Sequence, residues 1–234
     1  MKYKKIILGV ALALACFSSL NANALTETKV KKTETQTAAP NVYWTDGYGR
    51  VSYTTNSIIS PVVKIALKEF AGDMKAVTGF DAKEKSGAPI QIYQLDQLTN
   101  KEFSAVEKLG APLHLIITAK DAFYIGTRKG KLIVIGSNAR GTAYAIMKLS
   151  ELAGVSPLAA WNDLQPAQRK SLYTPVDQQW IEVPRIEFRG LALNNSQWMK
   201  PQNYSRIARL MLRLRANTLW QVDGRHEAAY NKAV

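Results

Sequence analysis

The chain has 234 residues, a net charge of +13 and a single cysteine, Cys16. Because Cys16 lies in the apolar N-terminal segment, the rest of the chain has no thiol. This excludes disulfides, zinc–thiolate sites and cysteine nucleophiles there. The basic excess favours an acidic partner, either nucleic acid or an acidic polymer. After the N-terminal segment, no stretch is apolar for long enough to predict a membrane span.

The first 24 residues have the pattern of an export signal. Three lysines precede the apolar stretch 6–15, and Ala22-Asn-Ala fits the small-x-small cleavage pattern. Ala13-Leu-Ala-Cys16 is a loose version of a lipoprotein signal, but it lacks a leucine at position 13, so we favour ordinary cleavage over anchoring through Cys16. We therefore expect a periplasmic or secreted protein, for which nucleic acid is the less fitting partner. Residues 25–40 are polar and rich in Thr and Lys, which predicts a disordered linker.

Residues 41–158 predict an N-terminal α/β accessory domain in which helices pack on a mixed sheet. Asp46-Gly47 indicates an early hairpin, and Ser60-Pro61 and Gly79 bound a helix with one apolar face. Further expected elements are strands at 89–95, 113–118, 123–125 and 132–135, a short helix at 101–109, and a helix that ends at Gly154 and Pro157. Arg128-Lys-Gly joins the last two strands as a hairpin.

The pattern changes after a connecting loop at 159–184. Residues 187–193 resemble a strand, 204–214 an amphipathic helix and 218–222 a second strand. This order predicts a right-handed βαβ unit. We interpret residues 185–234 as the start of a (β/α)8 barrel, of which two strands are an incomplete part.

Two motifs allow a ligand interpretation and a simpler structural one. Gly136-Ser-Asn-Ala-Arg-Gly-Thr142 follows a strand and opens a helix, but it lacks the lysine of a phosphate-binding loop. It is more simply a tight turn in which Ser137 or Asn138 caps the helix. The arginine-rich helix at 206–215 could bind a membrane surface or nucleic acid. It is more simply a core helix whose arginines form a solvated rim.

Candidate sugar-contacting residues lie in the loops. Trp44 and Trp220 fall in predicted strands and are expected in the core, whereas Trp161, Trp180 and Trp198 fall in loops, where stacking on sugars and ordinary packing are both open. His114 is expected to be structural. Polar groups follow both predicted barrel strands, where barrels place their sites. The predicted substrate-binding residues are Asn194, Asn195, Trp198, Asp223 and His226. No residue pattern predicts a metal site or a cofactor.

Several of these segments together resemble glycoside hydrolase family 115, the xylan α-1,2-glucuronidases. The resemblance runs from about Val62 to Trp220. Its best-matching segments are Gly136-Ser-Asn-Ala-Arg-Gly-Thr-Ala-Tyr-Ala-Ile, Leu149-Ser-Glu-Leu-Ala-Gly-Val-Ser-Pro, Trp161-Asn-Asp, Phe188-Arg-Gly-Leu-Ala-Leu-Asn and Leu212-Arg-Leu-Arg-Ala-Asn-Thr-Leu-Trp. The β-hexosaminidase-like enzymes and family 67 share the domain plan. The resemblance implies an α/β domain before a barrel, and removal of (4-O-methyl)glucuronic acid from xylan with inversion.

The site implied by this family is only partly present. Its catalytic acid and base are expected beyond Val234, so this chain alone is expected to be inactive. After the first barrel strand the family has Leu-Asn-Asp-Glu, whereas this chain has Leu193-Asn-Asn-Ser, without either carboxylate. A non-catalytic carbohydrate-binding module remains the alternative. No pattern indicates an oligomeric state.

Overall fold

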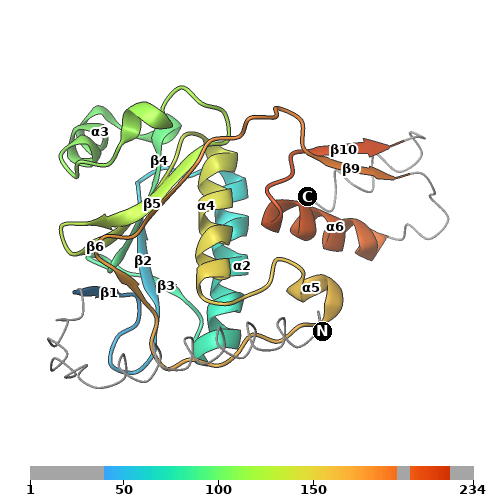
Figure 1. Cartoon of the computed structure of the whole chain (residues 1–234), viewed down its shortest axis with the longest axis horizontal. Coiled ribbons are helices and arrows are strands. Elements are labelled where there is room, and N and C mark those ends of the chain that lie inside the picture. Colours follow the sequence, from blue (N-terminus) through green and yellow to red (C-terminus); the bar gives the residue numbers. More distant parts are fainter. Residues whose placement is uncertain (1–39, 194–200, 222–234) are drawn as a thin grey trace, which may run out of the picture. The chain divides into compact units, whose positions relative to one another are not determined.

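A computed structural model describes residues 40–193 and 201–221. The predicted signal and all but the last residue of the predicted linker lie outside these residues. The main element is a six-stranded mixed sheet with the order β3-β2-β4-β6-β5-β8 (Figure 1). Its strands are β2 (Ser52–Thr55), β3 (Lys83–Glu84), β4 (Ile90–Gln94), β5 (Phe123–Arg128), β6 (Lys131–Gly136) and β8 (Gln179–Glu182). The first four in this order are parallel, and β5 is antiparallel to both of its neighbours. This confirms the predicted mixed α/β fold.

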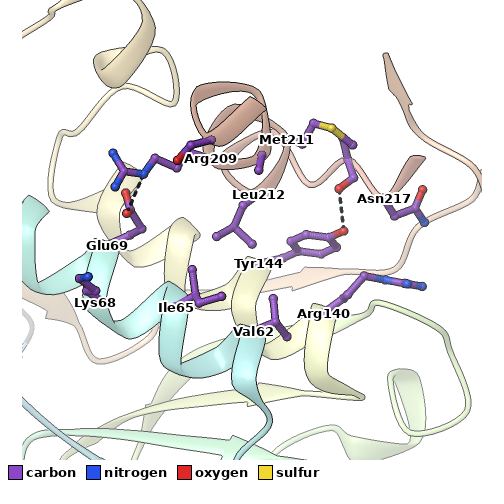
Figure 2. Close-up of a pocket in the computed structure, with 13 residues that line it drawn as sticks. Val62, Ile65, Lys68, Glu69, Arg140, Tyr144, Arg209, Met211, Leu212 and Asn217 are labelled. Atoms are coloured by element: carbon purple, nitrogen blue, oxygen red, sulfur yellow. Dashed lines mark hydrogen bonds and ion pairs between the residues drawn. The ribbon is translucent and has the colours of Figure 1, made fainter. Parts of the chain in front are cut away.

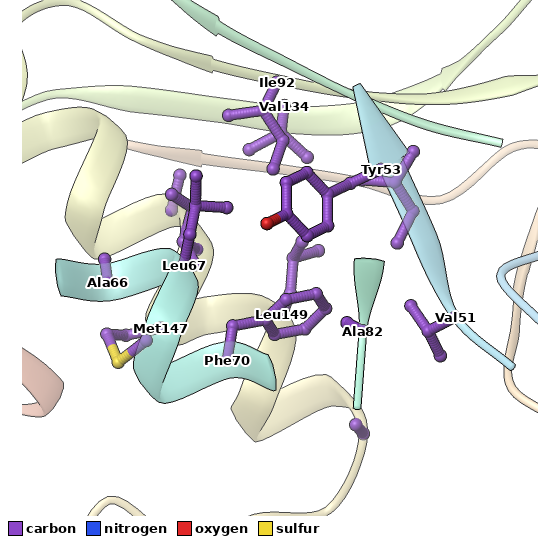
Figure 3. Packing of buried hydrophobic residues seen from close by; sticks show 14 of the residues in the cluster. Val51, Tyr53, Ala66, Leu67, Phe70, Ala82, Ile92, Val134, Met147 and Leu149 are labelled. Carbon is purple, nitrogen blue, oxygen red and sulfur yellow. The ribbon is translucent and has the colours of Figure 1, made fainter. Parts of the chain in front are cut away.

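The sheet is covered on both faces, and its central strand β6 is an uninterrupted apolar run from Leu132 to Ile135. On β6, Leu132 and Val134 belong to one buried cluster, and Ile133 and Ile135 belong to another. The first cluster packs under α2 (Pro61–Thr78) and α4 (Ala139–Leu152), which lie side by side (Figures 1 and 3). The second packs under α3 (Asn100–Glu107) and the short helices η1 (Leu95–Gln97) and η2 (Leu113–Leu115). Successive side chains of a strand point to opposite faces, so an uninterrupted apolar run serves both layers.

Helix α2 has the bounds that its sequence predicts. Pro61 occupies the first turn, and Gly79 ends the helix in the left-handed conformation at φ 87°. The expected apolar face is buried, and both Phe70 (Figure 3) and Met74 are fully enclosed. The predicted hairpin between β5 and β6 is also confirmed, and its two turn residues, Lys129 and Gly130, both have positive φ.

A capping box holds the start of α3. The Thr99 hydroxyl accepts from the backbone N–H of Glu102, whose carboxylate accepts from the Thr99 N–H at 2.9 Å. The backbone N–H groups of Ser57 and Thr99 lower the pKa of Glu102 to about 2.

We expect Thr99→Ala to lower the free energy of unfolding by about 1 kcal/mol, the usual loss for a helix cap. Urea titration followed by circular dichroism measures this change. The matched control is Ser104→Ala on an exposed position of the same helix, which should leave stability within about 0.5 kcal/mol of the parent. A Thr99 variant indistinguishable from this control would show that the cap contributes nothing.

Two expectations for the α/β layer of residues 41–158, called the first unit below, are wrong. Residues 113–118 form η2 and turns rather than a strand, and His114 is exposed in η2 rather than part of a strand. A short apolar run fits more than one structure, and here only Ile116 is fully buried, beneath α3. The early turn at Asp46 exists with a single bridge between Thr45 and Val51. The preceding strand β1 (Asn41–Tyr43), however, pairs with β7 (Tyr173–Pro175) instead of closing a hairpin.

The segment expected as a connecting loop, 159–184, contains regular structure. It includes α5 (Ala159–Asn162), β7 and β8, and β8 pairs with β5 at the edge of the main sheet. The residues of β8, Gln-Trp-Ile-Glu, are intermediate or exposed, as at the edge of a sheet, and therefore give only a weak hydrophobic pattern. Trp180, predicted in a loop, lies in β8 and packs against the main apolar cluster.

The second unit consists of β9 (Gly190–Leu193), α6 (Pro201–Arg213) and β10 (Thr218–Gln221). The two strands are parallel and paired in register from Gly190–Thr218 to Leu193–Gln221. A side chain at Gly190 would collide with the backbone carbonyl of Thr218, so glycine allows the close pairing there. The strand–helix–strand order is as predicted, and closure into a barrel stays a prediction.

Candidate functional site

The carboxyl ends of β9 and β10 are the edge at which a barrel would carry its site. Leu193 and Gln221 pair directly, so both strands end together at this edge. The predicted substrate-binding residues follow these two ends in the sequence. All of them, Asn194, Asn195, Trp198, Asp223 and His226, lie outside the described residues. The structure thus defines the two strand ends that these residues follow in the sequence.

A second polar site, which the sequence did not predict, joins the two units at Asp121. This side chain is 2% exposed and accepts four hydrogen bonds. Oδ1 accepts from Asn138 Nδ2 at 3.2 Å and from Arg140 Nε at 3.0 Å; Oδ2 accepts from Arg189 Nη2 and Asn217 Nδ2, both at 3.2 Å. We call these five residues the Asp121 junction. It connects three of the segments that carry the family resemblance: the glycine-rich turn, Phe188-Arg-Gly and Arg215-Ala-Asn-Thr.

The junction explains the glycine-rich turn before α4. Asn138 caps the helix, because its Oδ1 accepts from the backbone N–H of Gly141 at 2.8 Å. Gly141 itself lies so close to the Ala122 carbonyl that a side chain would not fit. The negative charge that a helix N-terminus attracts is supplied by the carboxylate of Asp121. This geometry favours the structural interpretation of the turn over nucleotide binding.

Asp121 is held as a charged, saturated carboxylate. Burial alone would raise its pKa, but the hydrogen bonds from Arg140, Asn138 and Asn217 outweigh burial and hold the pKa below its ordinary value. Each of its two oxygens accepts two hydrogen bonds, and the carboxylate stays ionised over the physiological range. Its chemistry is that of a structural anchor between the units, since a general acid would need a raised pKa.

A buried ion pair forms a second connection, between α6 and α2. Arg213 donates from Nη1 and Nη2 to the two carboxylate oxygens of Asp73, each at 2.9 Å, and Nη2 lies 3.3 Å from Glu69. The Arg213 side chain is 6% exposed. Burial alone would lower its pKa, but the bonds to Asp73 raise it overall. The expectation of a solvated arginine rim is therefore wrong for Arg213, because a partner on another helix compensates its charge.

The same interface encloses a cavity of about 340 Å³ between α2, α4 and α6 (Figure 2). Its walls are mainly apolar, and Val62, Ile65 and Leu212 point into it. At one end the Tyr144 hydroxyl donates to the Ala216 carbonyl at 3.0 Å; at the other, Arg209 pairs with Glu69 at 3.1 Å. The polar groups named at the two ends are thus paired within the protein, and the wall between them is mainly apolar.

The division of the tryptophans into buried and exposed side chains differs from the prediction. Trp44 is buried as expected and donates to Thr174 Oγ1 at 2.9 Å. Trp220, predicted in the core, is 68% exposed on β10. Trp161 is 38% exposed, but the Arg206 guanidinium lies 5.3 Å from its ring centre and partly occupies one face. Trp198 lies outside the described residues.

In the part of the chain that the structure describes, no cluster of His, Cys, Asp and Glu side chains has the arrangement of a metal site. No helix among the same residues is both long and apolar enough to cross a membrane.

Among known proteins, this chain is similar to several of known structure. No protein-family model matches the chain, and the search of curated proteins gives no match. A family 115 4-O-methyl-α-glucuronidase with specificity for decorated arabinogalactans is similar over 80% of this chain, with 27% identity and a TM-score of 0.67. The match covers 28% of that enzyme, so the chain spans less than a third of its length.

Two further structures share the fold. The chitobiase of Flavobacterium johnsoniae aligns with 78% of this chain and 25% of its own, at 16% identity and a TM-score of 0.51. A mutant β-hexosaminidase of Streptomyces plicatus aligns with 78% and 31%, at 13% identity and a TM-score of 0.52. At such identities these two support the architecture alone. The first comparison confirms the resemblance that the sequence motifs indicate: this chain is similar in sequence and fold to a family 115 glycoside hydrolase.

Proposed function

We propose that this chain is the N-terminal part of an exported glycoside hydrolase that acts on plant polysaccharide. The activity that fits best is an inverting α-glucuronidase removing (4-O-methyl)glucuronic acid from xylan. The observation that carries the proposal is the 27% identity to a family 115 enzyme across 80% of the chain. In this proposal residues 41–158, together with β7 and β8 of the following segment, form the accessory domain, and residues 185–234 begin the barrel. The N-terminal signal exports the protein to the periplasm or the exterior.

The fixed contacts between the two units support this organisation. The Asp121 junction and the Arg213–Asp73 pair both join the first unit to the β9–α6–β10 unit. They attach the beginning of the predicted barrel to a preformed α/β layer. The carboxyl ends of β9 and β10 are left as the place from which the site loops start. An accessory domain that served only as a spacer would not need a buried ion pair and a saturated carboxylate at this boundary.

Inversion requires two carboxyl groups on opposite sides of the scissile bond, with room for a water molecule between one of them and the sugar. Leu193 is followed by Asn-Asn-Ser, where the family has two carboxylates, so these positions cannot supply the pair. We therefore expect the acid and the base on later barrel strands of a longer protein. Residues 1–234 alone should not release sugar.

The alternative is a non-catalytic carbohydrate-binding module, based on the loop tryptophans. The structure weakens its basis at two positions. Trp180 packs against the core, and Trp161 has Arg206 over its ring. Each therefore has less open ring surface on which a sugar could stack.

The proposal is tested on the exported protein isolated from its source with an antibody against residues 40–193. Its intact mass is measured, and it is incubated with glucuronoxylan and with decorated arabinogalactan while released sugars are identified. A mass well above 26.0 kDa together with release of an acidic sugar of inverted anomeric configuration would support the proposal. Release of neutral or N-acetylated sugars only, or glycan binding without any release, would contradict it. The second outcome would establish the binding module instead.

A further inference from the structure

A groove of about 880 Å³ lies at the amino ends of β9 and β10. Its walls come from the turn before β5, the first turn of α4 and the segment Pro184–Arg189 that leads into β9. The Asp121 junction forms its floor. The proposed function gives this groove no role.

The groove carries an excess of positive charge. Lys120, Arg140, Arg185 and Arg189 line it, against the carboxylates of Asp121 and Glu187. Lys120 Nζ pairs with Glu187 at 2.9 Å, and Asp121 is shared by two arginines. Arg185 is exposed and makes no ion pair with any residue that the structure describes. One positive charge from Arg185 and one from the arginines around Asp121 therefore remain uncompensated at the wall.

Arg140 adds a directional element to this charge. It binds Asp121 through Nε, and its side chain is 50% exposed. Figure 2 shows its guanidinium extending away from Val62, on the side where Asn217 lies. The two terminal nitrogens of a guanidinium anchored in this way are oriented to donate as a fork, the geometry that suits a carboxylate.

An exposed aromatic ring lies beside these cations. Phe188 is 74% exposed and Ile186 is 66% exposed, both on the segment that borders the groove. Both side chains line the groove, so its wall offers apolar as well as cationic groups. A sugar ring presents an apolar C–H face and a polar rim, so it can stack on Phe188 while its substituents reach the arginines.

We propose that this groove binds a uronate-bearing polysaccharide, with Phe188 stacking on a sugar ring and Arg185 and Arg140 pairing with its carboxylates. The choice of a polysaccharide among polyanions rests on the proposed function. The positive charge and the exposed ring are observed independently of that function. A neutral glycan would leave the cations without a partner, and a small anion would not use the ring.

The test uses the full chain and affinity electrophoresis in gels that contain glucuronoxylan or the same polymer after reduction of its carboxyl groups. We expect the native polymer to retard the chain and the reduced polymer to do so much less, with retardation falling as salt rises. Arg185→Gln should weaken binding about three- to fivefold, and Phe188→Ala about fivefold. Both side chains are exposed, so both variants should keep the parent's circular dichroism spectrum and melting temperature.

The matched controls remove a cation and an aromatic ring from surface positions outside the groove. Lys64→Gln on α2 and Phe80→Ala after α2 alter exposed residues that do not line the groove, and they should bind as the parent does. Equal binding of native and reduced polymer, or equal effects of groove and control variants, would overturn the proposal. Tighter binding of single-stranded DNA, weakened by the same two variants, would also overturn it and identify a nucleic-acid surface. Sugar release by the exported protein tests the proposed function separately. Binding in the groove without sugar release would contradict only the proposed function, and sugar release without binding in the groove would contradict only this inference.

Discussion

Replacing Arg213 with methionine is expected to destabilise the protein by about 3–5 kcal/mol, the usual loss when one partner of a buried ion pair is removed. The methionine fills much of the space of the arginine stem but leaves Asp73 buried against α6 without its two hydrogen bonds. Glu69 loses one of its two arginine partners at the same time. The change should appear in urea titrations as a lower midpoint, and α6 should exchange its amide hydrogens faster than α2.

The control for this prediction lies one turn earlier on the same helix. Arg209 also pairs with Glu69, but its side chain is 49% exposed, so Arg209→Met should cost no more than about 1 kcal/mol. The double variant Arg213→Met/Asp73→Leu removes both buried charges and should recover most of the stability lost in the single variant. Equal effects of the two arginine substitutions would show that burial of Arg213 is not what couples α6 to α2.

Most of the α/β layer could be predicted because its signals are local. Helix α2 combines an apolar period with Pro61 and Gly79, and the β5–β6 hairpin has a turn that only a few residue types allow. The errors arose where local signals are weak. Residues 113–118 are too short for the period to distinguish a strand from a helical turn, and β8 is an edge strand with little alternation.

The two connections between the units could not be predicted, for a different reason. Asp73 and Arg213 are 140 residues apart in the sequence, and Asp121 and Asn217 are 96 apart. A helical pattern classes Arg213 as polar and places it at the surface, because the pattern carries no information about a partner on another helix. The sequence around Asp121 indicates a local turn and nothing about a distant partner. Its four donors come from segments that were recognised as family motifs without any indication that they meet at one side chain.

The Asp121 junction leads to the second large prediction, in which charge is removed while the backbone is kept. Asp121 has φ 59°, in the left-handed region that asparagine tolerates, so Asp121→Asn isolates the loss of the carboxylate. Two arginines then face a neutral amide, and we expect a loss of about 2–3 kcal/mol, less than for Arg213 because Arg140 is half exposed. Asp163→Asn is the matched control: Asp163 has φ 52° and is exposed, so stability should change little.

The same substitution should change how stability depends on pH. The pKa of Asp121 is lowered in the folded protein, so its contribution is fully present above the unfolded pKa of about 3.9 and is lost as the pH falls through the lower folded value. The difference between parent and Asp121→Asn should therefore be constant from pH 7 to about 5 and shrink below about 4. Urea titrations at pH 7, 5, 4 and 3 measure it. A difference that stays constant down to pH 3 would show that the lost stability comes from shape or hydrogen bonding rather than from the ionised carboxylate that holds the glycine-rich turn, β9 and β10 together.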